Sequence, residues 1–215
     1  MAVLEKRSFT FDVNAVETEA GEQIITGRPI VYNSRTNLGP FDEIIDTGAL
    51  DGADLTDVRF LINHNTNMIP LARSRRNNGN STMKISTDNK GLNLDFVKLD
   101  VENNSDARAL YSAVKRGDIS GMSFMFFVDG EAWENLESEH PTRHIRKIGS
   151  VVEVSAVTFP AYSSTEINAR SEAAALESAA AVLEKARAEN RAAVLDNTDL
   201  ELLKEKTKIL GGFQS

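Results

Sequence analysis

The chain up to about residue 162 is a succession of short runs of β-branched and aromatic residues, and this pattern restricts its fold more than any other feature. Gly, Asn, Asp and Pro separate the runs, which include RSFTFDV, QIITGRPIVY, VRFLINH, GLNLDFVKL, ISGMSFMFFV and VVEVSAVTF. The apolar side chains of RSFTFDV alternate, so that Phe9, Phe11 and Val13 share one face of an extended strand. So many short strands, joined mostly by turns, predict a small, closed or nearly closed, mostly antiparallel β-barrel.

Two short helices are expected within this strand-rich part, so the predicted fold class is α+β. A weak helical pattern lies around Thr47 to Leu55. A stronger pattern runs from Ser105 to Arg116, with a Ser or Asn cap at its start and basic residues in its last turn.

The composition changes after Tyr162, where the sequence becomes rich in Ala and Glu and loses its β-branched runs. Ser163 and Glu166 have the spacing of a helix capping box, and apolar residues then recur at alternating steps of three and four. We therefore expect a β-barrel domain over residues 1–162 and a helical C-terminal arm over residues 163–215. The arm is either a helical hairpin packed on its own barrel or a detachable, partner-binding segment, and the sequence leaves both open.

Composition and charge exclude several classes of protein. The chain has no cysteine, which rules out disulfides, thiol catalysis and thiolate metal sites. Its formal net charge of −8 argues against a broad nucleic-acid-binding face. The start MAVLEKRSFTFDV lacks a long apolar core, and no run of about twenty apolar residues occurs, so we expect neither a signal peptide nor a membrane span. These features favour a soluble intracellular protein.

Two serines interrupt the apolar run DISGMSFMFF, at positions 120 and 123. In an extended strand Ser123 shares a face with Gly121 and Met125, whereas Ser120 points to the other face. Only one of the two hydroxyls can therefore face a given site, and Gly121 leaves room beside Ser123. The alternative is that both hydroxyls simply bond to neighbouring strands.

Histidine occurs at three positions, and one of them stands out. His64 ends the apolar run VRFLINH, so it is either a core side chain with its bonds satisfied or part of a site. His140 and His144 lie in the polar stretch SEHPTRHIRK, where we expect solvent-exposed side chains. Because no HExxH or comparable spacing surrounds His64, a zinc site is not expected.

Glu153 places a carboxylate among β-branched residues in VVEVSAVTF, a strand expected to be covered on both faces. An unpaired buried charge is costly, so Glu153 needs a partner, which is either an Arg or Lys or the imidazole of His64. A serine hydroxyl needs a base to accept its proton, and an acceptor on the far imidazole nitrogen orients that base. Ser123, His64 and Glu153 have the chemistry for this arrangement, although their spacing does not prove that they meet.

Four segments in order resemble the prohead (procapsid) maturation proteases of tailed phages, serine proteases similar in fold to the herpesvirus assemblins. The segments are VRFLINHNTNMIPLARS, NKGLNLDFVKL, AVKRGDISGMSFMFFV and VVEVSAVTFPAYSSTEI. They carry an apolar strand ending in Asn-His, a Gly-Leu strand, a helix followed by a strand with a serine before an aromatic residue, and an acidic strand ending in proline. The resemblance spans roughly Arg7 to Ile167.

The resemblance implies a serine endopeptidase in which Ser123 is the nucleophile, His64 the general base and Glu153 the orienting acid. Glu153 stands where the assemblins carry a second histidine. The implied fold is a β-barrel ringed by helices, and neither cofactor nor metal is expected. Ser120 is then a control position without a role in the chemistry.

The oxyanion site is implied less completely. In assemblins it uses a backbone N–H and an arginine shortly after the third catalytic residue. The corresponding segment here has no arginine, so Ala161 is the candidate backbone donor. Arg73 or Arg75 could replace the arginine through space, or could simply belong to a solvated hairpin.

The biological role implied by the resemblance is maturation of the phage capsid. Such a protease is packaged inside the immature capsid in the host cytoplasm, where it cuts the scaffolding segment of the major capsid protein and often itself. The expected partners are that capsid protein and further copies of the protease, as a homodimer or a larger assembly, with neither membrane nor specific nucleic acid. The alternatives are a non-catalytic scaffold or assembly protein and a serine hydrolase acting on a small ester.

Overall fold

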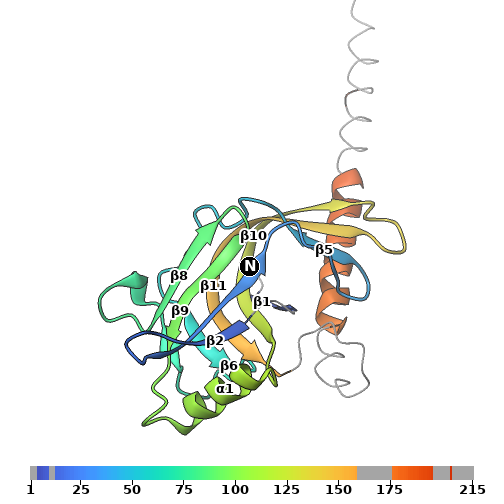
Figure 1. The fold of residues 1–215 in the computed structure, drawn as a ribbon. Coiled ribbons are helices and arrows are strands. Elements are labelled where there is room, and N and C mark those ends of the chain that lie inside the picture. Colours follow the sequence, from blue (N-terminus) through green and yellow to red (C-terminus); the bar gives the residue numbers. More distant parts are fainter. Residues whose placement is uncertain (1–3, 10–12, 159–175, 196–203, 205–215) are drawn as a thin grey trace, which may run out of the picture.

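Two β-sheets and two helices make up most of the described protein (Figure 1). The structure is a computed structural model, which describes residues 4–9, 13–158, 176–195 and 204. Within these residues the first sheet has seven strands: β1 (Leu4–Phe9), β4 (Thr36–Asn37), β5 (Asp42–Ile45), β6 (Arg59–Ile62), β7 (Ala72–Arg73), β10 (Gly121–Glu134) and β11 (Thr142–Val157). The second sheet has four: β2 (Val13–Glu17), β3 (Gln23–Val31), β8 (Met83–Asp88) and β9 (Gly91–Lys98).

The long strands β10 and β11 organise the first sheet. They pair antiparallel along their length, and β1 pairs antiparallel with the outer edge of β10. The other edge of β11 is shared, because β5 pairs parallel with Thr142–Ile145 and β6 pairs parallel with Glu153–Ala156. Register shifts between residues 125 and 131 of β10 mark bulges, which bend and twist a strand pair.

The hydrophobic core lies between the two sheets. It includes side chains from β10, β11 and β6 together with side chains from β3, β8 and β9, such as Met122, Phe124, Phe126, Val154, Phe60, Ile25, Ile85 and Leu92. Each large apolar side chain buried in this way contributes about 1.5–3 kcal/mol to folding. Met122, Phe124 and Phe126 of β10 therefore face the core, and Ser123, which lies between them, faces the opposite side.

Helix α1 (Ser105–Arg116) packs against β2 and β3 (Figure 1). The side chain of Asn104 accepts hydrogen bonds from the backbone N–H groups of Asp106 and Ala107, at 2.9 and 3.2 Å. Gly117 ends the helix in the left-handed conformation, with φ of 80°. The predicted helix from Ser105 to Arg116 is thus confirmed.

Two other expectations need comment. The helix predicted around Thr47 to Leu55 is wrong: the chain forms consecutive turns there, in which Gly48 and Gly52 have φ of 83° and 78°. Left-handed glycines stop a helix from propagating. The α+β class is confirmed, but no closed barrel is found among the residues that the structure describes, so the predicted barrel is unconfirmed.

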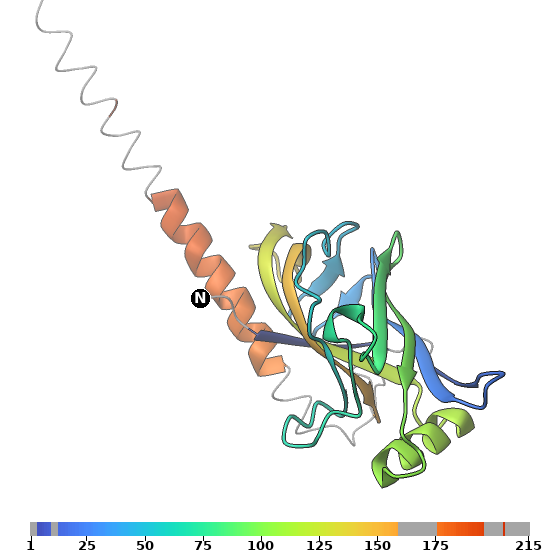
Figure 2. The same cartoon turned by 90° about the vertical axis from the view of Figure 1, so that its left-hand side faces the viewer.

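A second helix covers residues 176–195 and lies at the opposite end of the molecule from α1 (Figure 1 and Figure 2). Ala179 and Leu183 pack against Phe41, and the guanidinium of Arg187 donates to the carbonyls of Leu136 and Ser138 at 3.1 and 2.7 Å. This helix therefore contacts the end of the β10–β11 pair. The expected boundary at Ser163 lies outside the described residues, so the division into a domain and an arm is still a prediction.

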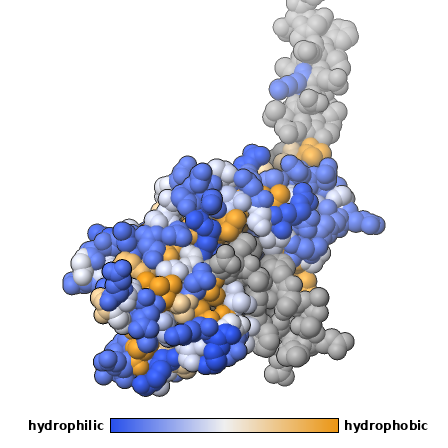
Figure 3. Space-filling model, viewed as in Figure 1, coloured by the Kyte–Doolittle hydropathy of each residue, from blue (hydrophilic) through white to orange (hydrophobic). Residues whose placement is uncertain are grey.

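The face drawn in Figure 3 is largely hydrophilic, with hydrophobic residues in small groups. In the described part of the chain, no helix is long and apolar enough to cross a membrane.

Candidate active site

His64 is carried by a tight turn at the end of β6. Asn63 and His64 both have left-handed backbone conformations, with φ of 51° and 57°. Asn adopts this conformation more readily than most residues, and strained backbones of this kind cluster at functional sites. The Asn63 side chain secures the turn, because it donates to Thr158 Oγ1 at 3.0 Å and accepts from the Thr158 backbone N–H at 2.9 Å.

The turn brings the imidazole of His64 into contact with two side chains from other strands. Its Nδ1 contacts Glu153 Oε1 on β11, and its Nε2 contacts Ser123 Oγ on β10. The three side chains are close to fully buried, with exposed fractions of 6% for His64, 2% for Glu153 and 0% for the whole Ser123 residue. A hydroxyl, an imidazole and a carboxylate therefore form a continuous chain of contacts.

The strand register explains why Ser123 and Glu153 meet the same imidazole. Ser123 lies opposite Ser155, and Met125 lies opposite Glu153, so Ser123 and Glu153 share a face on neighbouring strands. Ser120 lies elsewhere: it precedes β10 and is exposed. The expectation that it occupies the same strand on the opposite face is therefore wrong.

Ser155 belongs to the same group of contacts and was not among the predicted site residues. Its hydroxyl donates to Glu153 Oε2 at 2.6 Å and accepts from the backbone N–H of His64 at 3.1 Å. The residue is fully buried. The available signal was its position two residues after Glu153 on the same strand face, which places a hydroxyl beside that carboxylate.

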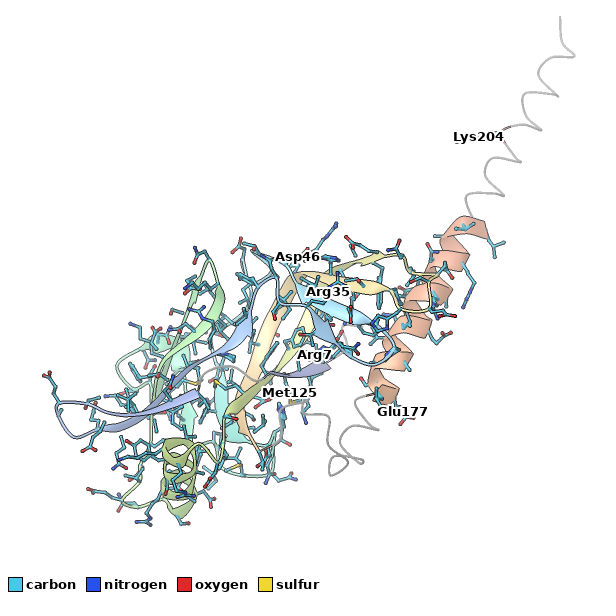
Figure 4. All side chains as sticks on the ribbon, turned by 45° about the vertical axis from the view of Figure 1, so that its right-hand side comes forward. Arg7, Arg35, Asp46, Met125, Glu177 and Lys204 are labelled. Atoms are coloured by element: carbon cyan, nitrogen blue, oxygen red, sulfur yellow. The ribbon has the colours of Figure 1, made fainter. Side chains whose placement is uncertain are left out.

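Strand β1 forms the other wall of the site. The Ser123 hydroxyl lies 2.6 Å from the backbone carbonyl oxygen of Arg7, within hydrogen-bonding distance. Figure 4 shows Arg7 near Met125, and their strands pair with Lys6 opposite Met125. Partial burial lowers the pKa of the Lys6 amine, and the negative charge of Glu153 acts in the opposite direction.

A buried ion cluster anchors β1 on the core-facing side of the sheet. The Arg7 guanidinium donates to Glu43 Oε2 at 2.7 Å and also contacts Glu5. Arg143 donates to Glu5 Oε1 at 2.7 Å, to Glu43 Oε2 at 3.0 Å and to Glu131 Oε2 at 2.8 Å. Sequence patterns did not identify this cluster, because its members come from four separate strands.

The pKa shifts in this cluster follow its pairing. Burial acts to raise the pKa of Glu5, but the hydrogen bonds and positive charges of Arg143 and Arg7 outweigh burial, so that pKa is lowered. Burial acts to lower the pKa of Arg143, yet its bonds to Glu5 and the charges of its carboxylate partners raise it. Both groups are thus held in their charged forms.

Among the described residues, neither arginine that was considered for the oxyanion site contacts Ser123. Ala161 lies outside them. Arg73 donates to Asp57 through Nε and Nη2, at 2.5 Å each, and Arg75 donates to the carbonyl of Asn80 at 2.5 Å. Both arginines therefore have partners away from Ser123.

Of the remaining histidines, His140 lies just before β11 and His144 lies in β11. His140 is exposed, as expected, and its Nε2 lies 2.9 Å from Asp42 Oδ1. His144 was also expected to be exposed, but its side chain is only 19% exposed and its Nδ1 lies 2.8 Å from Asp46 Oδ1. The parallel pairing of β5 with β11 brings the two aspartates to these rings.

We also considered metal sites and surface pockets away from Ser123. Within the described ranges, no group of three or more His, Asp or Glu side chains is arranged to hold a metal ion. A surface pocket of about 280 Å³ lies apart from Ser123 and is lined by Tyr32, Thr47, Gly48, Asp51, Thr87, Asp88 and Asn89.

One known protein family matches most of this chain. The model of the caudovirus prohead serine protease family matches residues 9–179, and the chain belongs to that family. Neither the curated proteins nor the solved structures contain a match. The family assigns the chain a serine protease activity with a role in phage capsid maturation and an interaction with capsid proteins.

Proposed function

We propose that this protein is an endopeptidase in which Ser123 is the nucleophile, His64 the general base and Glu153 the residue that orients the histidine. One observation carries the proposal: the imidazole of His64 contacts the Ser123 hydroxyl through one nitrogen and the Glu153 carboxylate through the other. Membership of a serine protease family supports the same roles.

The proposed reaction proceeds through an acyl-enzyme. Ser123 Oγ passes its proton to His64 Nε2 and attacks the carbonyl carbon of the scissile peptide bond. The imidazolium then gives that proton to the leaving amine as the C–N bond breaks. Water, deprotonated by the same imidazole, hydrolyses the ester and restores the Ser123 hydroxyl.

Glu153 and Ser155 act on the histidine rather than on the substrate. The carboxylate of Glu153 accepts from His64 Nδ1–H, which leaves Nε2 as the nitrogen that receives the serine proton. Ser155 holds the second carboxylate oxygen and the His64 backbone. Ser155 is therefore a positioning residue of the proposed triad.

The proposed substrate is the scaffolding segment of the major capsid protein, cut inside the immature capsid in the host. Family membership supports this assignment, since the family is that of prohead proteases. Self-cleavage within or before the C-terminal helical arm is part of the same proposal. The arm over residues 163–215 would then act in targeting or self-association before it is removed.

The test is co-expression of the protein with its capsid protein, followed by measurement of the capsid subunit mass. Wild type should yield a shortened subunit, and Ser123→Ala should leave the full-length subunit. Ser120→Ala is the matched control and should behave as wild type, because Ser120 is exposed and precedes β10.

Two results would reject the proposal. A shortened subunit with Ser123→Ala would exclude Ser123 as the nucleophile. Unchanged particle maturation with both Ser123→Ala and His64→Ala would instead favour a non-catalytic scaffold. Mass spectrometry of the purified, active protein tests self-cleavage separately, since an intact C-terminal arm after long incubation contradicts it.

A further inference from the structure

Strand β1 lies beside Ser123, the proposed nucleophile, along the edge of β10. It is the end strand of the first sheet, and its only strand partner within the described residues is β10, which carries Ser123. Ser8 is the residue directly opposite Ser123. Extended peptides are commonly recognised by pairing with the free edge of a sheet, and here the edge of β10 is occupied by the chain's own β1.

The contact between β1 and the nucleophile opposes catalysis. The Ser123 hydroxyl has one hydrogen and two nearby acceptors, the carbonyl oxygen of Arg7 at 2.6 Å and Nε2 of His64. When that hydrogen is donated to Arg7, it is not available to His64, and the base cannot activate the hydroxyl. Ser123 is also 0% exposed, so a substrate carbonyl cannot reach its hydroxyl in this arrangement.

From these contacts we propose that β1 is an inhibitory strand that occupies the substrate's place along β10, and that an extended segment of the substrate polypeptide pairs with β10 when β1 leaves. This inference rests on the proposed function of Ser123. It identifies the ligand by its chemistry: a backbone in β conformation, with a carbonyl group in the position now taken by that of Arg7.

The buried ion cluster explains why the covered state is the resting state. Glu5 and Arg7 of β1 pair with Arg143 on β11 and Glu43 on β5, and all four side chains are at most 8% exposed. When β1 leaves, Glu43 and Arg143 each lose a partner, which opposes release. Since Glu43 and Arg143 still contact each other, the cluster can survive the departure of β1 in part.

A reversible cross-link between β1 and β10 tests the inference. Leu4 and Phe127 are directly opposite across the two strands, and the chain has no cysteine of its own, so Leu4→Cys with Phe127→Cys adds a single possible disulfide. The readouts are covalent labelling of Ser123 by a small fluorophosphonate and cleavage of purified capsid precursor. Both rates should fall by about tenfold or more on oxidation, because the locked strand removes the open fraction, and should return on reduction.

The matched control places the same chemistry elsewhere. Val16 and Ile24 are opposite residues of β2 and β3 in the second sheet, so Val16→Cys with Ile24→Cys should respond little to oxidation. Equal rates for the oxidised and reduced β1–β10 variant would overturn the inhibitory role of β1 while leaving the protease intact. If neither the wild type nor a folded variant with a weakened β1 anchor labels or cleaves, the proposed function is overturned, and this inference with it.

A second variant tests the same inference without new cysteines. Glu5→Gln weakens the anchor of β1, because the carboxylate that contacts both Arg7 and Arg143 becomes neutral. Labelling of Ser123 should become severalfold faster in the folded variant. An unchanged or slower rate would contradict the inference.

Discussion

The two ends of β11 bury charged side chains in different ways. Near its start, Arg143 is surrounded by the carboxylates of Glu5, Glu43 and Glu131. Near its end, Glu153 contacts an imidazole and a hydroxyl, those of His64 and Ser155. The first environment pairs carboxylates with guanidinium groups, and this pairing lowers the pKa of Glu5 and raises that of Arg143. The second environment contains an imidazole, that of His64. Proton transfer requires a group of this kind, which can both accept and donate a proton.

This difference separates a group that stabilises the fold from a group proposed to act in catalysis. Both ends of β11 are in the same strand and both pair with β10 on one edge and a short parallel strand on the other. The chemistry of the neighbouring side chains, rather than burial, therefore distinguishes them. Substitutions near the start of β11 should accordingly change the free energy of unfolding, and substitutions near its end should change the rate of catalysis.

The largest expected effect is at the proposed triad. Ser123→Ala should lower kcat/KM on the order of thousands-fold or more, and adding His64→Ala should cause little further loss, because the two residues act as a unit. Steady-state cleavage of purified capsid precursor measures both variants. Independent, multiplicative losses would show that the two side chains do not work together.

At the other end of β11, Arg143→Met should act on stability. Removing one member of a buried ion cluster leaves its partners unpaired, so the free energy of unfolding should fall by about 3–5 kcal/mol. Urea denaturation measures this loss. Arg35→Met is the control, since Arg35 is 58% exposed where it pairs with Asp42, and a similar loss there would remove the distinction between buried and surface pairs.

Glu153→Gln tests whether the end of β11 near His64 serves catalysis rather than stability. The amide keeps the shape of the side chain but not its charge, so the histidine loses the partner that orients it and stabilises its protonated form. We expect kcat to fall about a hundredfold to a thousandfold while the protein stays folded. Wild-type kcat in a well-folded Glu153→Gln variant would remove Glu153 from the mechanism.

The smallest expected effect is the pH dependence of the ion cluster. The pKa of Glu5 is lowered from its ordinary value of 4.5, so its folded form binds a proton less readily than its unfolded form. The stability that it contributes is present above pH 4.5 and is lost as the pH falls towards the folded pKa. Urea midpoints of wild type and Glu5→Gln should therefore converge below pH 4.5, and a constant difference down to acid pH would contradict this assignment.

Local patterns predicted the helix at Ser105–Arg116 and the main strands, because capping residues and side-chain alternation act over a few residues. They failed at Thr47 to Leu55, where two left-handed glycines make turns instead of a helix. The same alternation singled out Ser123 and Glu153, and the structure reports contacts of both with His64. Their catalytic roles are still predictions, as are the barrel closure and the oxyanion role of Ala161.

The sequence by itself determined which side chains share a face within a regular extended run, such as Met122, Phe124 and Phe126, since alternation is a property of the extended backbone alone. Only the tertiary structure decided which strands are neighbours: that β1 lies against β10, that β11 is flanked by β5 and β6, and that Glu5, Arg7, Glu43 and Arg143 form one cluster. The reason is physical. Neighbours in a sheet are selected by the burial of the whole core and the pairing of distant charges, and neither is encoded in any single segment.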